Sequence, residues 1–223
     1  MRFKAAIFDL DGTLLDTLED LADSANRVLR SLDLPVHPVE SYRYFVGEGM
    51  VRLVERILPP DRRDEPFVAR VVEAFRNDYG HHWKDKSGMY DGIPAMLDGL
   101  AAAGLKLAVL SNKPDEFTRV CVRDLLPGFP LDPVFGQRPG IAPKPDPAAA
   151  LEIAAMLDSA PAEILYLGDT ATDMQTACRA GMFAVGALWG FRTREELEEN
   201  GARAVVRRPE DVLRLVRPQA QPA

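Results

Sequence analysis

Residues 3–17 read FKAAIFDLDGTLLDT, a short apolar run that leads into an acidic loop. The run has the length and composition of a buried strand, and Asp9 and Asp11 lie at its end. Residues 105–110 (LKLAVL), 164–167 (ILYL) and 183–187 (FAVGA) are further short apolar runs. Because helical patterns separate these runs, the sequence predicts an α/β fold with a Rossmann-like, doubly wound parallel sheet.

The chain between the first two strands has a different pattern. Apolar residues recur at helical spacing over residues 18–32, 50–58 and 67–83, and no strand-like alternation occurs between residues 17 and 84. We therefore expect an all-α insert after the first strand. The predicted domains are residues 1–15 and 88–223, which form the α/β core, and residues 16–87, which form the helical insert.

Three local features give narrower expectations. Asp16 and Glu19 have the spacing of a capping box, which places the start of the first helix there. The two cysteines, Cys121 and Cys178, are too few for a disulfide scaffold, and we expect both to be buried. The last six residues, 218–223, are expected to be frayed.

Composition and charge exclude several classes of protein. The chain has 223 residues, of which 47% are hydrophobic and 27% charged, and its formal net charge is −7. No basic run interrupts this balance, so no nucleic-acid partner is expected. The uncharged stretches are shorter than the ~20 residues that span a bilayer, and no secretory signal is recognised at Met1–Lys4. We expect a cytoplasmic protein with no membrane partner.

The residues that follow the predicted strands carry most of the candidate chemistry. Ligands of parallel α/β sheets bind beyond the carboxyl ends of the strands. The residues expected at this edge are Asp9, Asp11, Gly12, Thr13, Ser111, Asn112, Lys144, Asp169 and Asp173. Carboxylates gathered in this way repel one another unless a cation lies among them. Oxygen ligands without a set of Cys or His ligands indicate Mg²⁺ as the cofactor.

This set of side chains is typical of phosphoryl transfer. One carboxylate can act as the nucleophile and form an aspartyl-phosphate, while a second protonates the leaving oxygen and then deprotonates water. A lysine and a serine can hold the phosphoryl oxygens, since catalysis of this reaction is mainly positioning and charge stabilisation. Gly12 and Thr13 suit a tight loop whose backbone donors approach phosphate.

Four ordered motifs resemble those of the haloacid dehalogenase superfamily, in the form carried by its phosphatases. They are Asp9-Leu-Asp11-Gly-Thr13, Ser111-Asn112-Lys113, Lys144-Pro-Asp-Pro147 and Gly168-Asp169-Thr-Ala-Thr-Asp173. Together they span nearly the whole chain. The insert is similar to the small helical cap of the subgroup that includes phosphoglycolate phosphatases. Asp11 disfavours the dehalogenases and the phosphonate hydrolases, which lack an acid at this position.

The resemblance implies a role for each matching residue. Asp9 would be the nucleophile and a magnesium ligand, and Asp11 the general acid and base, which gives the metal its backbone carbonyl. Asp169 would be the remaining metal ligand. Asp173 would act through water or orient Lys144, although it could also simply cap a helix. The residues expected to bind phosphate are Thr13, Ser111, Asn112 and Lys144.

The cap resembles that of the phosphoglycolate phosphatases around residues 46–50 (VGEGM). Gly47 and Gly49 would face the active site, although a glycine-rich turn between helices is also consistent with them. Arg43 and Arg52 flank this loop, and arginine forms bidentate pairs with carboxylates. The resemblance therefore implies that the substrate is a small phosphorylated metabolite, namely 2-phosphoglycolate. It also makes Arg43 and Arg52 candidates for binding the carboxylate of this substrate.

Other functions stay open at this point. Phosphatases with the same fold hydrolyse pyrophosphate, nucleotides or sugar phosphates, and a β-phosphoglucomutase-like phosphomutase shares most of the motifs. Receiver domains of signalling systems also gather acidic residues, Mg²⁺, a hydroxyl and a lysine, so a non-enzymatic phospho-aspartate switch is a further alternative. Such domains lack a helical insert after the first strand. Either a monomer or a homodimer is consistent with the sequence.

Overall fold

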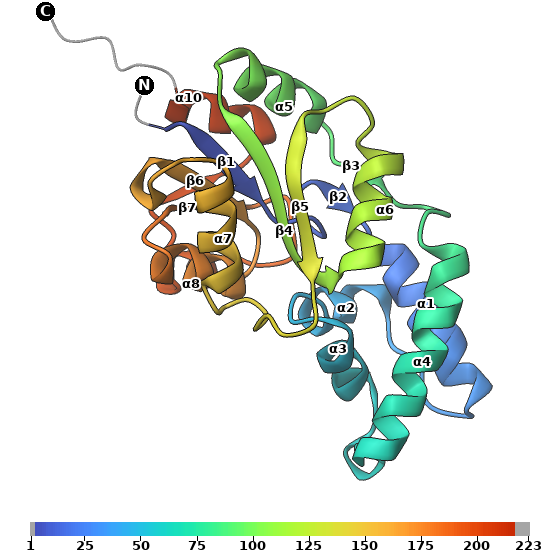
Figure 1. Ribbon diagram of the computed structural model, residues 1–223. Coiled ribbons are helices and arrows are strands. Elements are labelled where there is room, and N and C mark those ends of the chain that lie inside the picture. Colours follow the sequence, from blue (N-terminus) through green and yellow to red (C-terminus); the bar gives the residue numbers. More distant parts are fainter. Residues whose placement is uncertain (1–2, 217–223) are drawn as a thin grey trace, which may run out of the picture.

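The computed structural model describes residues 3–216 and is centred on a six-stranded parallel sheet (Figure 1). Its neighbouring strands pair in parallel throughout. In spatial order they are β5 (Leu131–Gln137), β4 (Lys106–Pro114), β1 (Ala5–Phe8), β6 (Ile164–Gly168), β7 (Phe183–Ala187) and β8 (Ala204–Val206). This arrangement confirms the predicted α/β fold.

Helices cover both faces of the sheet, as Figure 1 shows. Ala5 and Ile7 of β1 belong to one buried cluster, whereas Ala6 and Phe8 belong to the other, because side chains of a strand alternate between faces. The first cluster includes side chains of α7 (Ala148–Met156), α8 (Ala171–Arg179) and α9 (Arg194–Glu199). The second includes side chains of α5 (Ile93–Ala102), α6 (Asp115–Leu125) and α10 (Val212–Val216). The sheet is thus doubly wound, as predicted.

Strand β1 lies at the point where the strand order of the sheet reverses. The chain passes outward from β1 to β4 and β5, returns to β6 on the other side of β1, and then passes outward to β7 and β8. The carboxyl ends of β1, β4 and β6 therefore lie next to one another at the point where α/β sheets bind ligands.

The segment between β1 and α5 is mostly helical. It begins and ends in two short antiparallel strands, β2 (Leu15–Asp16) and β3 (Gly88–Met89). Between them lie α1 (Leu18–Ser31), α2 (Tyr42–Phe45), α3 (Met50–Ile57) and α4 (Glu65–His82), with 3₁₀ turns at Val39–Ser41 and Pro60–Arg62. A helical insert is thus observed, and its division from the core at residues 16 and 87 stays a prediction.

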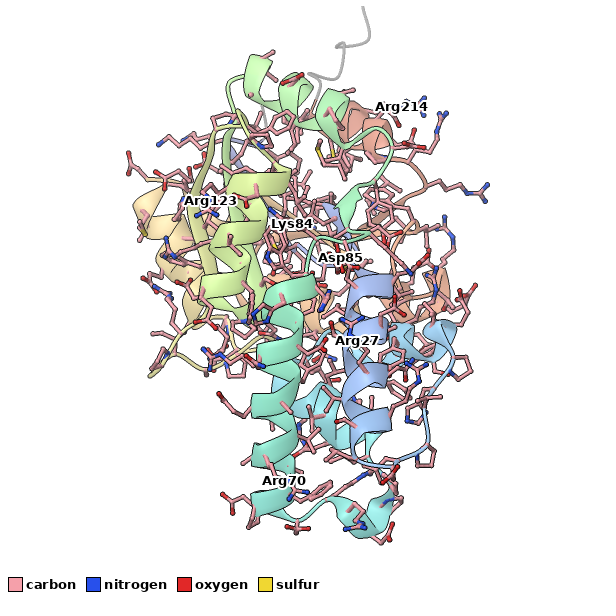
Figure 2. All side chains as sticks on the ribbon, turned by 90° about the vertical axis from the view of Figure 1, so that its right-hand side faces the viewer. Arg27, Arg70, Lys84, Asp85, Arg123 and Arg214 are labelled. Carbon is pink, nitrogen blue, oxygen red and sulfur yellow. The ribbon has the colours of Figure 1, made fainter. Side chains whose placement is uncertain are left out.

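Helices α1 and α4 lie side by side in the insert (Figure 2). Apolar side chains between them include Leu21 and Val28 of α1 and Phe75 of α4. At the surface, Arg27 of α1 forms an ion pair with Asp78 of α4, with 2.7 Å between Nη2 and Oδ1. Within residues 3–216, no helix has both the length and the apolar character needed to cross a membrane.

The return connection from the insert to the core is anchored by a buried acid. The Asp20 carboxylate of α1 accepts hydrogen bonds from the backbone N–H groups of Lys86 and Ser87, at 3.0 and 2.8 Å, and from the Ser87 hydroxyl at 2.6 Å. Asp20 is only 2% exposed. Because a buried carboxylate needs such donors, this contact fixes the start of α1 against the segment that leads to β3.

Several local expectations are wrong. Thr17 rather than Asp16 is the residue before α1, and the Thr17 side chain makes no capping hydrogen bond, while Oδ1 of Asp16 accepts from the Leu18 backbone N–H at 3.3 Å. Cys121 is buried as expected, but Cys178 is exposed near the end of α8. Strand β4 was expected to end at residue 110, yet it continues through Pro114 and so contains the whole second motif. Residues 218–223, which were expected to be frayed, lie outside the described residues.

Candidate active site

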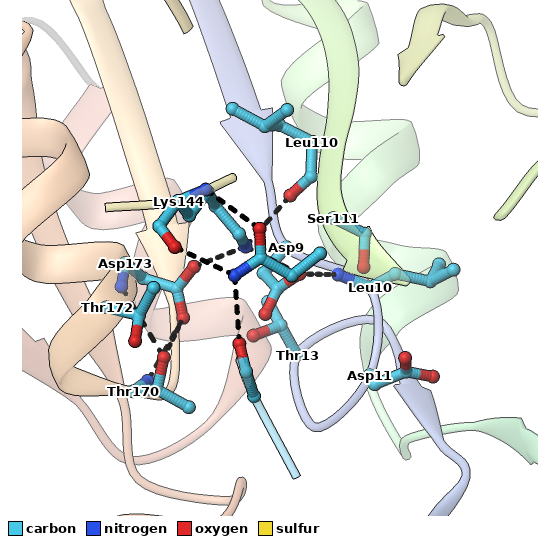
Figure 3. Close-up of polar contacts among 12 residues, drawn as sticks. Asp9, Leu10, Asp11, Thr13, Leu110, Ser111, Lys144, Thr170, Thr172 and Asp173 are labelled. Carbon is cyan, nitrogen blue, oxygen red and sulfur yellow. Dashed lines mark hydrogen bonds and ion pairs between the residues drawn. The ribbon is translucent and has the colours of Figure 1, made fainter. Parts of the chain in front are cut away.

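The carboxyl edge of the sheet brings the predicted side chains together from four segments of the chain (Figure 3). Asp9 directly follows β1, and its backbone N–H continues the sheet by donating to the Leu167 carbonyl of β6 at 2.9 Å. Ser111 lies within β4, and Asp169 follows β6. Lys144 comes from the loop that precedes α7. Each of these side chains is at least nine-tenths buried.

Lys144 lies between two carboxylates. Its Nζ is 2.9 Å from Oδ1 of Asp9 and 2.7 Å from Oδ1 of Asp173, and it also donates to the Leu110 carbonyl at 3.0 Å. Burial alone would lower the pKa of Lys144, but the Asp173 and Asp9 carboxylates raise it well above the usual value. Lys144 is therefore a cation held beside Asp9.

Asn112 fixes the backbone around Lys144. Its Oδ1 accepts from the Lys144 backbone N–H at 2.8 Å, and its Nδ2 donates to the Lys144 carbonyl at 3.0 Å. The same Nδ2 donates to the carbonyl of Gly47 in the insert at 3.1 Å. Asn112 thus connects the second motif, the third motif and the loop between α2 and α3.

Asp173 makes the contacts expected for two of its predicted roles, which are capping a helix and orienting Lys144. It lies in the first turn of α8, where Oδ2 accepts from the Thr170 backbone N–H at 3.1 Å and from the Thr170 hydroxyl at 2.6 Å. Its Oδ1 is the partner of Lys144. One carboxylate therefore caps α8 and holds the lysine in place.

A buried group of three acids surrounds the end of β1. One carboxylate oxygen from each of Asp9, Asp169 and Asp173 lies within 4.8 Å of the other two. Burial and repulsion from Asp173 raise the pKa of Asp9 well above its usual value. The same two causes raise the pKa of Asp169 to about 7. Buried like charges at this distance favour either protonation or a bound cation.

The position of Asp169 is closely defined. Its Oδ1 accepts from the Thr13 hydroxyl at 2.9 Å, and its Oδ2 accepts from the Phe191 backbone N–H at 2.8 Å. A Cβ atom at Gly12 would lie 2.4 Å from Oδ2 of Asp169, and one at Gly190 would lie 2.3 Å from its Cβ. Both positions therefore need glycine. The observed partner of the Thr13 side chain is Asp169, so its contact with phosphate stays a prediction.

Asp11 lies apart from this group. Its carboxylate accepts from the Thr17 hydroxyl at 2.7 Å and from Nζ of Lys113 at 2.8 and 3.1 Å. Figure 3 shows this carboxylate away from the cluster formed by Asp9, Lys144 and Asp173. Lys113 belongs to the second motif, but the sequence predicts no role for it, because the motif does not show that its side chain reaches Asp11.

A cavity lies between the sheet edge and the insert, with about 510 Å³ of empty space including the part open to solvent. Asp9, Asp11 and Ser111 line its core side, and Gly47 and Gly49 line its insert side. Gly49 has φ of +88°, and a Cβ atom there would lie 3.3 Å from the Asn112 carbonyl. The glycine loop thus faces the second motif at close range.

The two predicted cap arginines are absent from the described lining of the cavity. Arg52 forms an exposed ion pair with Glu55 at 2.7 Å. Arg43 pairs with Glu40 and donates to the Gly190 carbonyl at 2.8 Å, which links the insert to the loop after β7. Arg192 of that loop donates to the carbonyls of Arg43 and Val46 in return. Contact of Arg43 or Arg52 with a substrate carboxylate stays a prediction.

The fold and the site together define a class of hydrolase: a doubly wound α/β enzyme whose switch point holds an aspartate beside a buried lysine and further carboxylates. The family model of the haloacid dehalogenase-like hydrolases matches residues 6–187. This match covers all four motifs. The chain belongs to the haloacid dehalogenase-like hydrolases, as its sequence predicts.

The chain is similar over most of its length to several proteins named as phosphoglycolate phosphatases. The chain is 33% identical over 208 residues to a phosphoglycolate phosphatase of Thiobacillus denitrificans, with 91% of each chain covered. It is 31% identical over 214 residues to a phosphoglycolate phosphatase of Aquifex aeolicus, with 96% of each covered. The crystal structure of a proposed phosphoglycolate phosphatase from Lactobacillus delbrueckii has a TM-score of 0.91 and 33% identity, covering 97% of this chain and 99% of that one.

Proposed function

We propose that this protein is a Mg²⁺-dependent phosphatase that hydrolyses a small phosphate monoester through an aspartyl-phosphate on Asp9. The observation that carries the proposal is the buried contact of Asp9 with Lys144 at the switch point, beside Asp169 and Asp173. A carboxylate nucleophile next to a fixed cation is the arrangement that phosphoryl transfer needs, because negative charge spreads over the transferred group.

The donor set fits a magnesium ion. Asp169 and Asp9 offer carboxylate oxygens, and their raised pKa values reflect burial and mutual repulsion that a divalent cation would relieve. The backbone carbonyl of Asp11 would be a third ligand. When bound, Mg²⁺ stabilises negative charge on the phosphoryl oxygens. Asp173 already pairs with Lys144, so we assign it to positioning that lysine.

The first transfer is a displacement at phosphorus. A carboxylate oxygen of Asp9 forms a bond to phosphorus, and the bond from phosphorus to the ester oxygen breaks. The leaving oxygen keeps the bonding electrons and receives the proton of the Asp11 carboxyl. Lys144, the Ser111 hydroxyl and the Asn112 backbone N–H hold the phosphoryl oxygens during this step, and Thr13 fixes Asp169.

The second transfer returns the enzyme to its starting state. Asp11, now a carboxylate, takes a proton from a water molecule whose oxygen attacks phosphorus. The bond between phosphorus and Asp9 breaks, and inorganic phosphate is released. The same residue thus serves as acid and then as base, so one proton passes through Asp11 in each turnover.

The substrate that we propose is 2-phosphoglycolate, which yields glycolate and phosphate. Two observations support it. The relatives in Thiobacillus denitrificans and Aquifex aeolicus are phosphoglycolate phosphatases. The loop that contains Gly47 and Gly49 lies close to the second motif, where the Gly47 carbonyl accepts a hydrogen bond from Asn112. The cavity that remains between them is suited to a small leaving group.

The test is a panel of phosphate esters assayed for phosphate release with Mg²⁺ and with a chelator. The panel contains 2-phosphoglycolate, hexose phosphates, nucleoside monophosphates and pyrophosphate. We expect Mg²⁺-dependent release, with kcat/KM for 2-phosphoglycolate at least about tenfold above the others, since one well-made polar contact is worth about a factor of ten. A preference for another ester would contradict the substrate, and β-glucose 1-phosphate converted to glucose 6-phosphate without release of phosphate would indicate a mutase.

A further inference from the structure

Lys113 is a buried cation whose contacts join the core to the insert. It lies in β4, and its side chain is 4% exposed. Its Nζ donates to both oxygens of Asp11, at 2.8 and 3.1 Å, and to the hydroxyl of Tyr79 in α4 at 2.8 Å. Burial alone would lower the pKa of Lys113, but the Asp11 carboxylate raises it well above the usual value.

Tyr79 holds this ammonium group against the wall of the insert. The Tyr79 ring stacks on Phe75 and meets Phe117 edge-on, with centroid distances of 5.7 and 5.3 Å. Nζ of Lys113 lies 4.7 Å from the centroid of the same ring. These contacts do not involve Asp11, so they keep Lys113 at the cavity when Asp11 moves.

Lys113 is also the one cation among the described residues that line the cavity. The neighbouring wall is apolar and consists of Leu21, Val46, Met50, Leu53, Phe75, Tyr79, Pro114 and Phe117. Without Asp11, the Tyr79 hydroxyl would be the one remaining described hydrogen-bond partner of this ammonium group, and a buried charge without a counter-ion is costly. Lys113 therefore needs an anion at all stages of the reaction.

The acid role of Asp11 conflicts with its present contacts. Its oxygens accept from Lys113 and Thr17, and the carboxylate lies away from Asp9 (Figure 3). To reach an ester oxygen on a phosphoryl group at Asp9, the Asp11 carboxyl must leave Lys113. Lys113 would then be a buried cation without a carboxylate partner, unless a second anion takes the place of Asp11.

We propose that Lys113 selects the substrate: a carboxylate on the leaving group replaces Asp11 at the Lys113 ammonium group and so frees Asp11 for proton transfer. This inference rests on the proposed phosphatase function. It names the substrate class as phosphate monoesters with an anionic group close to the ester oxygen. Such a substrate supplies its own anion to Lys113, whereas a neutral leaving group leaves Asp11 paired.

The test compares two esters whose leaving alcohols are of similar basicity, 2-phosphoglycolate and 2-hydroxyethyl phosphate. In the wild type we expect kcat/KM to favour 2-phosphoglycolate by at least about thirtyfold, the size of a buried charge contact. Lys113→Met removes the cation, so the ratio should fall to within about threefold. We expect KM for 2-phosphoglycolate to rise, so that kcat/KM falls much more for 2-phosphoglycolate than for the neutral ester.

Three further variants guard the interpretation. Lys113→Arg keeps a cation and should retain a preference of at least about tenfold. Lys113→Gln, which is polar but neutral, should lose the preference as Lys113→Met does, and it serves if the methionine variant does not fold by circular dichroism. Lys106→Met changes a lysine at the other end of β4, where Nζ contacts the Leu157 carbonyl, and should leave the ratio unchanged.

Two outcomes would overturn the inference while the phosphatase function stands. One is equal losses for both esters in Lys113→Met and Lys113→Gln, which indicates a purely structural lysine. The other is a wild type that hydrolyses both esters equally well. A folded wild type that releases phosphate from neither ester nor from p-nitrophenyl phosphate in Mg²⁺ would instead overturn the proposed function itself.

Discussion

The sheet edge around Asp9 and the insert wall of the cavity differ in how they treat charge. At the sheet edge, Asp9, Lys144 and Asp173 are at least nine-tenths buried, and each contacts another charged group. On the insert, the charged residue Arg52 is exposed and pairs with a neighbour on its own helix, while the wall that faces the cavity is apolar. Lys113 bridges the two regions.

This difference assigns a separate task to each region. Buried charges at fixed distances stabilise a charged transition state because they need no rearrangement during the reaction. An apolar wall chiefly limits the size and charge of the leaving group. Changes at the sheet edge should therefore abolish turnover, and changes on the insert should alter the choice of substrate.

The largest effect is expected at the nucleophile. Asp9→Asn keeps the shape of the side chain but removes the attacking carboxylate, so kcat should fall by at least about 10⁴-fold for every ester. Phosphate release in excess Mg²⁺ measures this, and circular dichroism checks the fold. Turnover within tenfold of the wild type would reject covalent catalysis by Asp9 and remove the distinction between the two regions.

Asp11→Asn should give the next largest effect, and one that depends on the leaving group. Loss of a general acid costs about 10²–10⁴-fold when the leaving oxygen is strongly basic. For p-nitrophenyl phosphate, whose leaving group needs little protonation, the loss in the first transfer should be much smaller. Burst kinetics separate the two transfers. Equal losses in the first transfer for alkyl and nitrophenyl esters would show that Asp11 is not the acid.

The buried acids should make the metal-free protein sensitive to pH. Asp169 has a pKa of about 7 in the folded protein, above that of the unfolded chain. A carboxyl group whose pKa is raised by folding adds to the free energy of unfolding. This contribution is complete below about pH 4 and is lost as pH rises through about 7. We therefore expect Tm in chelator to fall between these pH values, and added Mg²⁺ to restore it at pH 8.

Asp169→Asn tests the same repulsion at a single site. An amide can accept from the Phe191 N–H group and donate to the Thr13 hydroxyl, so the local contacts survive without the charge. In chelator at pH 8, Tm should rise by about 3–6 °C while activity is lost. Asp98→Asn, an exposed change on α5, serves as the control. A lower Tm in Asp169→Asn alone would show that the cluster is not repulsive.

The smallest effects are expected for the arginines of the insert. Arg52→Ala removes an exposed ion pair and should change KM for 2-phosphoglycolate by less than about twofold. Arg43→Ala breaks the contact with the Gly190 carbonyl and should raise KM by about three- to tenfold. A larger rise for Arg52→Ala, confined to substrates with a carboxylate, would instead establish the contact predicted from the sequence.

The sheet edge could be predicted from the sequence because its residues directly follow or end buried strands. Asp9, Ser111 and Asp169 each come at the end of an apolar run, and parallel strands bring such positions together. Capping a helix and orienting Lys144 were both among the predicted roles of Asp173, and the structure shows both contacts. The order of the four motifs was sufficient to predict the family.

The contacts across the cavity could not be predicted in the same way. Tyr79 has the spacing of an apolar core residue on its helix, and nothing in that spacing indicates a partner on β4. Arg52 is close to the glycine loop in sequence, yet its helical position turns it toward solvent. Such contacts depend on how the insert sits on the sheet. The cytoplasmic location and the choice between monomer and homodimer also stay predictions.

The most direct test of the central claim is a rapid-quench experiment with 2-phosphoglycolate and Mg²⁺, followed by mass spectrometry of the acid-quenched protein. We predict a species heavier by one phosphoryl group, located on Asp9 by peptide mapping, which forms and decays at rates consistent with kcat. Asp11→Asn should accumulate this species from p-nitrophenyl phosphate, and Asp9→Asn should not form it. Steady turnover of the wild type without any phosphorylated species, or with the label on another residue, would contradict the account.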